Sequence, residues 1–397
     1  YTPYLNVVAL CGRLIDIPMD VQKSVIDFEY PEKCEIRSYK PTTKGNYVQV
    51  RRVMAALEEA EKPLICIGGG VFAAHAENEI RELADLMQIP VITTMMGISV
   101  FPDDDQLFCG MIGTHGVKMA NAAVNECDVL FLVGARVGDR AVKTPLALEK
   151  TTKIIHIDID PAEIGKNIGA DLPLVGDAKL VLQQMTELAK PMKHDEWIAH
   201  IKTLGGERKY VEPAKGTVNP RVFIDRLAKK MPANVTVVAD VGQNQIWTCT
   251  EYKFRKEGRL LTSGGMGTMG YSVPAAIGAK MADNSRATVA ICGDGAFQMS
   301  FMELATAVQF GVDIKVVVMT NNRLGMVREL QTNGYHDRQT AVFLDGSPDF
   351  IKLAEAYGIP AMRVYDDDTM DKGVEMLAEH KGICLVEVVV DKDMPTL

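Results

Sequence analysis

The chain has 397 residues, too many for one ordinary hydrophobic core, so two or three domains are expected. With 47% hydrophobic and 24% charged residues its composition is that of a soluble globular protein, and a net charge of −9 argues against nucleic-acid binding. No apolar run reaches the roughly 18 residues of a membrane span and no signal-peptide pattern opens the sequence, so we expect a cytoplasmic protein.

The eight cysteines are scattered, with no C-x-x-C pair and no metal-ligand spacing. Several lie in apolar runs, as Cys66 does in residues 63–67. This usage predicts reduced, buried thiols, as in a reducing cytoplasm.

The first periodic patterns follow a polar stretch with Pro31, Pro41 and Gly45, which we interpret as part of a linker over residues 23–45. From residue 46 to residue 190, helical and strand patterns alternate and predict an α/β layer domain. The expected strands are 64–67, 91–94, 129–133 and 154–159. The expected helices are 77–87, 118–127 and 179–188.

Residues 191–215 contain two prolines and many charges, which we interpret as a second linker. Asn219 and Pro220 then open a helix, with Asn219 as its N-cap and Pro220 in its first turn. Residues 216–397 form the last predicted α/β unit, which begins with an expected strand at 235–239.

The most informative motif lies within this unit. An apolar run at 288–292 meets Gly293-Asp294-Gly295, a helix-like segment follows at 300–310, and a second apolar run at 314–319 ends at Asn321. A right-handed βαβ crossover places the carboxyl ends of the two strands side by side, so Asp294 and Asn321 should face one crevice. Carboxylate and amide oxygens suit Mg²⁺ together with phosphate oxygens, and the glycines allow close backbone approach to a diphosphate.

This arrangement resembles the cofactor-binding signature of thiamine diphosphate (ThDP) enzymes. Three further segments match it in order and spacing, namely 241–245 after the strand at 235–239, 264–270 before 274–279, and 324–328 after Asn321. Together, from residue 14 to about residue 390, they look most like the large, catalytic subunit of acetolactate synthase (acetohydroxyacid synthase). The fold implied is α/β, with tandem doubly wound parallel-sheet domains: a ThDP-binding fold and a Rossmann-like central domain.

The resemblance also implies roles for individual residues. The metal would be held by Asp294, the side chain of Asn321 and the main-chain oxygen of Arg323. Met269 matches a bulky residue that wedges between the two rings of the cofactor, with core packing as the alternative. The positions that match ThDP contacts are Gly242, Gln243, Asn244, Gly267, Met269, Gly293, Asp294, Gly295, Ala296, Asn321 and Met326.

One essential group has no counterpart in this sequence. In the family, a glutamate of the N-terminal domain of a neighbouring subunit activates the aminopyrimidine, and residues 14–22 resemble the segment that closes that domain. We interpret residues 1–22 as a remnant of it, and no acidic residue precedes Asp16, so the activating glutamate is expected upstream of Tyr1. The chain alone is therefore expected to be inactive. The resemblance implies a homodimer or homotetramer and a possible small regulatory subunit.

The central domain matches the part of acetolactate synthase that carries FAD. Glycines at strand ends permit close approach to a pyrophosphate, and Arg136 offers a fork of donors, although the triple glycine does not complete G-x-G-x-x-G. Flavin-binding relatives usually show Arg-Phe-Asp-Asp-Arg where this chain has residues 136–140, so a vestigial dinucleotide fold remains the alternative. The matching positions are Gly68, Gly69, Gly70, Gly134, Ala135, Arg136, Arg140, Asp158 and Asp177.

The implied reaction decarboxylates pyruvate and condenses the product with a second 2-keto acid to give 2-acetolactate, in branched-chain amino acid biosynthesis. Four positions after Met326, where the family has a Trp that favours 2-ketobutyrate, this chain has Leu330. One methylene is worth about 1–3 kcal/mol in any pocket, so we expect little acceptor preference. The alternatives are another ThDP-dependent 2-keto-acid decarboxylase or carboligase, and a non-catalytic nucleotide-binding protein.

Overall fold

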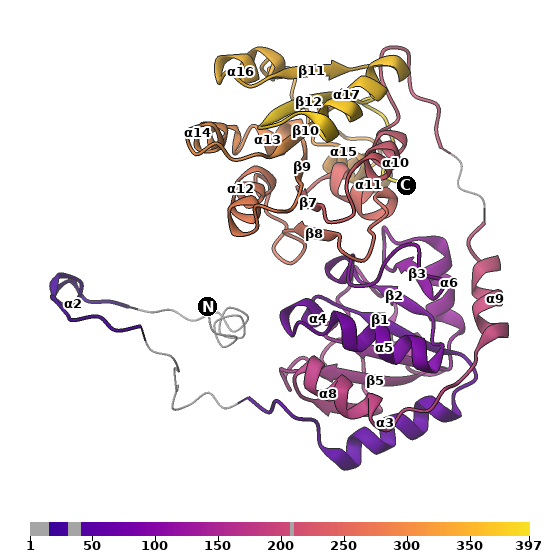
Figure 1. The fold of residues 1–397 in the computed structure, drawn as a ribbon. Helices are drawn as coiled ribbons and strands as arrows, with labels where there is room; N and C mark the ends of the chain where they lie inside the picture. The colour runs from indigo at the N-terminus through magenta and orange to yellow at the C-terminus, as the bar shows by residue number, and fades with distance from the viewer. Residues whose placement is uncertain (1–15, 31–40, 207–209) are drawn as a thin grey trace.

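The computed structural model describes residues 16–30, 41–206 and 210–397. Two parallel sheets, each of six strands with helices on both faces, make up the two domains in Figure 1. The strand orders are β3-β2-β1-β4-β5-β6 and β11-β12-β10-β9-β7-β8. The predicted α/β class with tandem doubly wound parallel sheets is therefore confirmed.

The central sheet consists of short strands whose inner members are continuous apolar runs, because helices cover both faces. Its strands are β1 (Pro63–Ile67), β2 (Val91–Thr93), β3 (Phe108–Met111), β4 (Val129–Val133), β5 (Lys153–Asp158) and β6 (Leu172–Val175). Its helices are α3 (Tyr47–Glu59), α4 (Gly70–Ala73), α5 (Glu77–Met87), η1 (Met95–Gly97), α6 (Lys118–Glu126), α7 (Pro145–Leu148) and α8 (Ala178–Thr186). Strands β3 and β6 were not predicted, because these edge strands are only half-buried and lack a long apolar run.

The segment interpreted as a second linker contains a helix, α9 (Asp195–Thr203). The Trp197 indole N–H donates to the Pro63 carbonyl oxygen at 3.0 Å, and both Trp197 and Ile201 are buried. The segment between the two domains therefore contains a helix packed on the central domain, which the sequence did not indicate. Three apolar side chains, those of Trp197, Ile198 and Ile201, attach α9 to the central domain, and so short a pattern does not stand out among prolines and charges.

The second sheet forms the centre of the C-terminal domain. Its strands are β7 (Thr236–Ala239), β8 (Arg259–Thr262), β9 (Thr288–Gly293), β10 (Lys315–Thr320), β11 (Ala361–Val364) and β12 (Cys384–Val389). Its helices are α10 (Pro220–Lys230), α11 (Gln243–Glu251), α12 (Ser272–Ala282), α13 (Asp294–Phe297), η2 (Phe301–Glu303), α14 (Leu304–Gln309), α15 (Gly325–Gly334), α16 (Phe350–Ala356) and α17 (Asp367–Glu379). Asn219 caps α10 as predicted, since its side-chain oxygen accepts from the N–H groups of Arg221 and Val222. The helix expected at 300–310 is divided into η2 and α14.

Specific polar contacts join the two domains. Asp103 donates its N–H to the Phe254 carbonyl oxygen and accepts the Phe254 N–H on its carboxylate, both at 2.8 Å. Arg259, on β8, pairs with Glu77 at the start of α5 at 3.1 Å. These contacts hold β8 and the adjoining loops of the C-terminal domain against the central domain (Figure 1).

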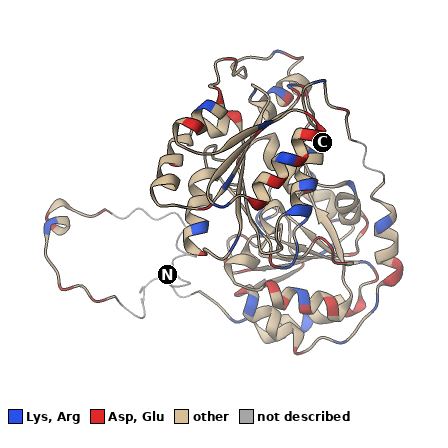
Figure 2. Ribbon diagram, turned by 45° about the horizontal axis from the view of Figure 1, so that its top comes forward, with Lys and Arg blue, Asp and Glu red and all other residues tan. Residues whose placement is uncertain are grey.

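Charged side chains of both signs are interspersed on the helices of both domains (Figure 2). Arg226 of α10, for example, pairs with both Asp367 and Asp371 of α17 at 2.9 Å. Within the described parts of the chain, no helix has the length and apolar character needed to cross a membrane.

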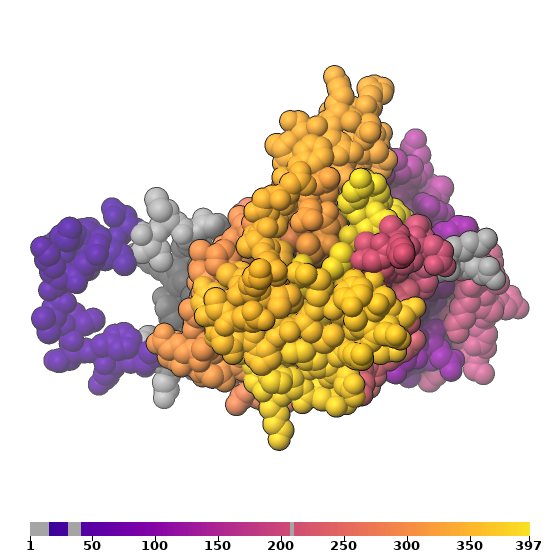
Figure 3. All heavy atoms as spheres, turned by 90° about the horizontal axis from the view of Figure 1, so that it is seen from above, coloured from indigo at the N-terminus to yellow at the C-terminus, as the bar shows by residue number. Residues whose placement is uncertain are grey.

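The segment interpreted as a remnant of the N-terminal domain is described only in part. Residues 16–30, which include α2 (Met19–Lys23), are exposed and lie away from both sheets (Figures 1 and 3). The rest of the interpreted remnant, from Tyr1 to residue 15, lies outside the described residues. The glutamate expected upstream of Tyr1 therefore stays a prediction, because it precedes both the described residues and the sequence itself.

Candidate cofactor site

The candidate site lies at the carboxyl ends of β7, β9 and β10. The chain passes from β7 to its neighbour β8 on one side and then to β9 on the other, so the ends of β7 and β9 flank a topological switch point. Ligands of open α/β sheets bind in the crevice at such a point. The register pairs Met319 with Gly293, which brings the residues after β9 and β10 together.

Asp294 is the most constrained group of the site. Its side chain is buried, with the residue 2% exposed, and one carboxylate oxygen accepts the backbone N–H groups of Asn321 and Asn322 at 3.1 and 2.6 Å. The other oxygen accepts the N–H of Gly295 at 2.8 Å. Burial raises the pKa of the Asp294 carboxyl to about 6, against the opposing effect of these hydrogen bonds. A carboxylate this desolvated gains from a nearby cation.

Asn321 turns its side chain between two partners. Its Nδ2 donates to Gln243 Oε1 at 3.3 Å, and its Oδ1 accepts the Arg323 N–H at 3.1 Å. The Arg323 guanidinium points away to Asp345, at 2.9 Å. The donor set at this corner therefore contains a carboxylate, an amide oxygen and the main chain around Arg323, which fits the chemistry of Mg²⁺.

The loops around this corner are built for close backbone approach. Gly242 has φ +145°, and a Cβ there would lie 2.6 Å from Asn244 Oδ1. A Cβ on Gly295 would lie 3.5 Å from the end of the Met269 side chain, so Met269 reaches over the Gly-Asp-Gly turn. Gly267, at φ +74°, has open space where a side chain would stand. The other predicted ThDP contacts lie around the same strand ends, with Gly293 ending β9, Ala296 buried in α13 and Met326 half-buried in α15.

The side-chain amide nitrogen of Asn244 is hydrogen-bonded to the backbone of two neighbouring strand ends. Its Nδ2 donates to the carbonyl oxygens of Asp240 at 2.8 Å and Ile291 at 3.2 Å, which ties the ends of β7 and β9 together. Asp240, which was not predicted as a site residue, is fully buried and accepts the N–H groups of Gly270 and Ser272 at 3.0 and 2.8 Å. An acidic residue directly after a buried strand, the same signal that marked Asp294, would have identified it.

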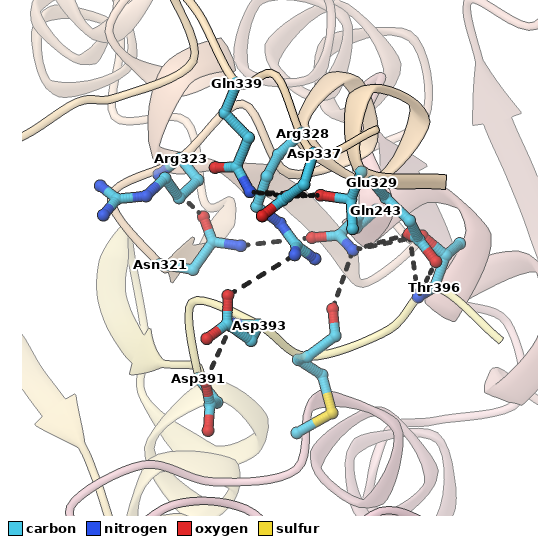
Figure 4. A network of polar contacts seen from close by, with 12 residues as sticks. Gln243, Asn321, Arg323, Arg328, Glu329, Asp337, Gln339, Asp391, Asp393 and Thr396 are labelled. Atoms are coloured by element: carbon cyan, nitrogen blue, oxygen red, sulfur yellow. Dashed lines mark hydrogen bonds and ion pairs between the residues drawn. The ribbon is translucent and has the colours of Figure 1, made fainter. Parts of the chain in front are cut away.

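Gln243 lies at the centre of a polar network (Figure 4). Its Nε2 donates to Glu329, to the Met394 carbonyl oxygen and to the Thr396 hydroxyl, while its Oε1 faces Asn321. Glu329 and Thr396 carried no sequence signal, because residues far apart in sequence meet only in the folded chain.

Known proteins are similar to this chain over almost its whole length. The family described as "Thiamine pyrophosphate enzyme, C-terminal TPP binding domain" matches residues 240–388, and the central domain of the same enzymes matches residues 50–185. A probable acetolactate synthase large subunit of Methanocaldococcus jannaschii is 40% identical over 95% of this chain and 66% of that protein. An acetolactate synthase of Arthrospira platensis is 39% identical over 97% of this chain and 69% of that protein.

This chain belongs to the acetolactate synthase family of thiamine pyrophosphate enzymes. A large subunit of Corynebacterium glutamicum, 39% identical over 90% of this chain, is covered to 59% of its length. The chain thus spans between 59% and 69% of the length of these three relatives. The family resemblance inferred from the motifs is confirmed.

In this member of the acetolactate synthase family, the glycines of the central domain pack against each other. A Cβ on Gly68 would lie 2.1 Å from the Gly134 carbonyl oxygen, and one on Gly70 would lie 2.7 Å from Gly134 Cα. The Gly70 N–H donates to the Gly134 carbonyl oxygen at 3.0 Å. Backbone contact between the ends of β1 and β4 is therefore sufficient to explain these glycines, whether or not a pyrophosphate binds there.

The remaining predicted flavin contacts of this acetolactate synthase family chain are spread around the same end of the sheet. Arg136 is exposed and its guanidinium lies 3.8 Å from where a Cβ on Gly265 would stand, toward the ThDP-site loop 264–270. Asp177 caps α8 by accepting the Leu180 N–H, and burial raises the pKa of Asp158. Gly69 opens α4, Ala135 is buried and Arg140 is exposed.

The two positions at which this sequence was expected to depart from the family pattern are Val137, which is buried, and Leu330, which is exposed. Val137, in the altered 136–140 segment, is buried with φ +46°, which is a strained conformation for a β-branched residue. Leu330, which stands where the acetolactate synthase family has Trp, is 62% exposed on α15. The described residues do not enclose Leu330 in a pocket.

Proposed function

We propose that the protein is an acetolactate synthase catalytic subunit, which decarboxylates pyruvate and condenses the product with a second 2-keto acid to 2-acetolactate. The observation that carries this proposal is the contact of Asp294 with the backbone of Asn321 and Asn322 at the switch point of the sheet. The family's membership in the thiamine pyrophosphate enzymes supports it.

The side chains present suit the binding of Mg²⁺ and ThDP. Asp294, the Asn321 side-chain oxygen and the main-chain oxygen of Arg323 would hold the metal, and the metal would hold the diphosphate. When bound, ThDP supplies the electron sink for decarboxylation of a 2-keto acid. The chain's own contribution would be to orient the cofactor: the Gly242 turn would leave room for the diphosphate, and Met269, lying over Gly295, would supply an apolar wedge for its rings.

The central domain is proposed to bind FAD between the strand ends that carry Gly68 and Gly134. Arg136 supports this, because it follows Gly134 and Ala135 after β4 and its guanidinium is exposed, so it is free to form paired hydrogen bonds with a pyrophosphate. The buried, strained Val137 stands against it, since it alters the segment that contacts the flavin in the family.

The protein is also proposed to form a homodimer or homotetramer, with a possible small regulatory subunit. Large apolar side chains are exposed on α12 and η2 and in the neighbouring loops of the C-terminal domain. Exposed apolar side chains become favourable to bury when a partner covers them. These side chains are Met266, Met281, Met299, Met302 and Phe310.

The test uses full-length protein with pyruvate, Mg²⁺ and ThDP, and quantifies both 2-acetolactate and free aldehyde. Formation of 2-acetolactate supports the proposal, whereas release of aldehyde without condensation indicates a different ThDP-dependent decarboxylase. Asp294→Ala should abolish both Mg²⁺-dependent ThDP binding by calorimetry and product formation. Asp371→Ala, which removes an exposed carboxylate on α17, is the matched control. Near-wild-type ThDP affinity in Asp294→Ala would refute the site.

A further inference from the structure

Glu329 lies on α15 and is held in place by a buried threonine. The Thr396 N–H lies 3.3 and 3.2 Å from the two carboxylate oxygens of Glu329, and the Thr396 hydroxyl donates to the carboxylate as well. Thr396 is buried. The Glu329 carboxylate therefore has one orientation, in which Oε2 also accepts from Gln243 Nε2 at 3.1 Å.

The side-chain amide of Gln243 could in principle be turned with either its nitrogen or its oxygen toward Glu329. Its surroundings allow only the orientation with the nitrogen toward Glu329. Its Nε2 faces the Glu329 carboxylate, the Met394 carbonyl oxygen at 2.9 Å and the Thr396 hydroxyl oxygen at 3.2 Å. An amide oxygen in that place would meet a carboxylate and a carbonyl with no proton between them. Because Gln243 is buried, this repulsion would not be screened by water.

The orientation of the Gln243 amide in turn fixes the orientation of the Asn321 amide. Gln243 Oε1 accepts from Asn321 Nδ2 at 3.3 Å, so Asn321 Oδ1 must lie on the other side of its amide. The Arg323 N–H donates to Asn321 Oδ1 at 3.1 Å and so favours the same orientation of the Asn321 amide. Glu329, Gln243 and Asn321 form a row in Figure 4, from α15 through the first residue of α11 to the end of β10.

We infer that Glu329 is a positioning residue that acts through Gln243 to keep the oxygen of the Asn321 amide, rather than its nitrogen, available to the cation. This rests on the proposed function, because it assigns Asn321 to Mg²⁺. Mg²⁺ takes oxygen ligands, so an Asn321 amide turned the other way would contribute nothing to it. Partners that orient metal ligands typically change metal affinity by about 10- to 100-fold when removed.

The experiment measures ThDP uptake by the full-length protein with calorimetry while Mg²⁺ is varied. In Glu329→Leu, the Mg²⁺ concentration for half-maximal uptake should rise about 10- to 100-fold. ThDP affinity at saturating Mg²⁺ should change much less. Glu329→Gln keeps an oxygen acceptor for Gln243, so it should restore most of the Mg²⁺ affinity. Val327→Ala, on the same helix with an exposed side chain, is the control for a general disturbance of α15.

Three results would overturn the inference. One is an unchanged Mg²⁺ requirement in a folded Glu329→Leu variant, and another is an equal loss in Glu329→Gln and Glu329→Leu. If Glu329→Leu does not fold, the Thr396→Val variant takes its place, because it removes the hydroxyl that fixes the Glu329 carboxylate. It should raise the Mg²⁺ requirement as well. An unchanged Mg²⁺ requirement in Thr396→Val is the third result that would overturn the inference. Absence of Mg²⁺-dependent uptake in the wild-type protein would instead refute the proposed function itself, and the inference with it.

Discussion

The carboxylate of Asp294 accepts the backbone N–H of Asn321 at 3.1 Å, although 27 positions separate the two residues. The contact joins the ends of the adjacent parallel strands β9 and β10. It places a negative charge in a buried corner, where backbone N–H groups, among them those of Gly295, Asn321 and Asn322, provide the compensation. The folded chain therefore bears a cost of desolvation at this corner that a bound cation would offset.

That cost predicts a pH dependence of stability without ligands. Burial raises the pKa of Asp294 from its ordinary 3.8 to about 6, so between these values the unfolded chain binds fewer protons than the folded one. The contribution of Asp294 to the free energy of unfolding should then fall by about 3 kcal/mol in all as the pH rises from about 3 to about 7, most of it between pH 4 and pH 6. Urea denaturation of wild type and Asp294→Asn over this range measures the difference in slope. Parallel curves for the two proteins would contradict the prediction.

Acceptor choice should respond to Leu330. Because Leu offers less ordered contact area than an indole, the wild-type enzyme should show little preference for 2-ketobutyrate over pyruvate. Leu330→Trp should shift the product ratio toward acetohydroxybutyrate by roughly 10- to 100-fold. A competition assay with both keto acids quantifies the two products, with Val327→Trp as the control on the same helix. A wild-type enzyme that already selects 2-ketobutyrate strongly would show that another residue shapes the acceptor pocket.

Flavin binding should depend on Arg136. If its guanidinium pairs with the pyrophosphate, Arg136→Ala should weaken FAD affinity by roughly 10- to 100-fold, the value of a hydrogen bond to a charged group. Purified full-length protein should be yellow or take up FAD stoichiometrically, and absorbance titration measures this in wild type, Arg136→Ala and the exposed control Lys150→Ala. A colourless, fully active enzyme that is indifferent to FAD would identify the strained Val137 segment as the mark of a lost site.

The described cysteines should be chemically inert in the folded protein. All six are buried and free, and burial raises the pKa of Cys66, Cys109, Cys127 and Cys249 to about 12 and that of Cys384 to about 11. The thiolate is the reactive form, so at pH 8 none of these should react with iodoacetamide until the protein is denatured. Peptide mass spectrometry checks each site separately, and rapid labelling of any of the six, Cys292 included, would contradict their burial. The remaining two, Cys11 and Cys34, lie outside the described residues.

Those parts of the protein that local patterns encode could be predicted from the amino-acid sequence. Continuous apolar runs between helical patterns predicted the four inner strands of the central sheet and strands β7, β9 and β10 of the second sheet. Asp294 and Asn321 were expected at one edge because parallel strands present their carboxyl ends together. The edge strands β3, β6, β8 and β11 and helix α9 were not predicted, because half-buried strands and a short helix leave only weak periodicity. The buried strand β12 was not predicted either.

Only the tertiary structure decided which polar groups meet. Asn244 was expected to contact ThDP, yet its Nδ2 joins the ends of β7 and β9, and Glu329 and Thr396 converge on Gln243 from elements 86 and 153 positions away. The same holds for the glycines at 68, 70 and 134, where a motif typical of a nucleotide site is also required by backbone packing. Hydrogen-bond partners depend on directions and distances within a few ångströms. These are set by how the two sheets, their helices and the C-terminal residues pack together, and no spacing along the chain records them.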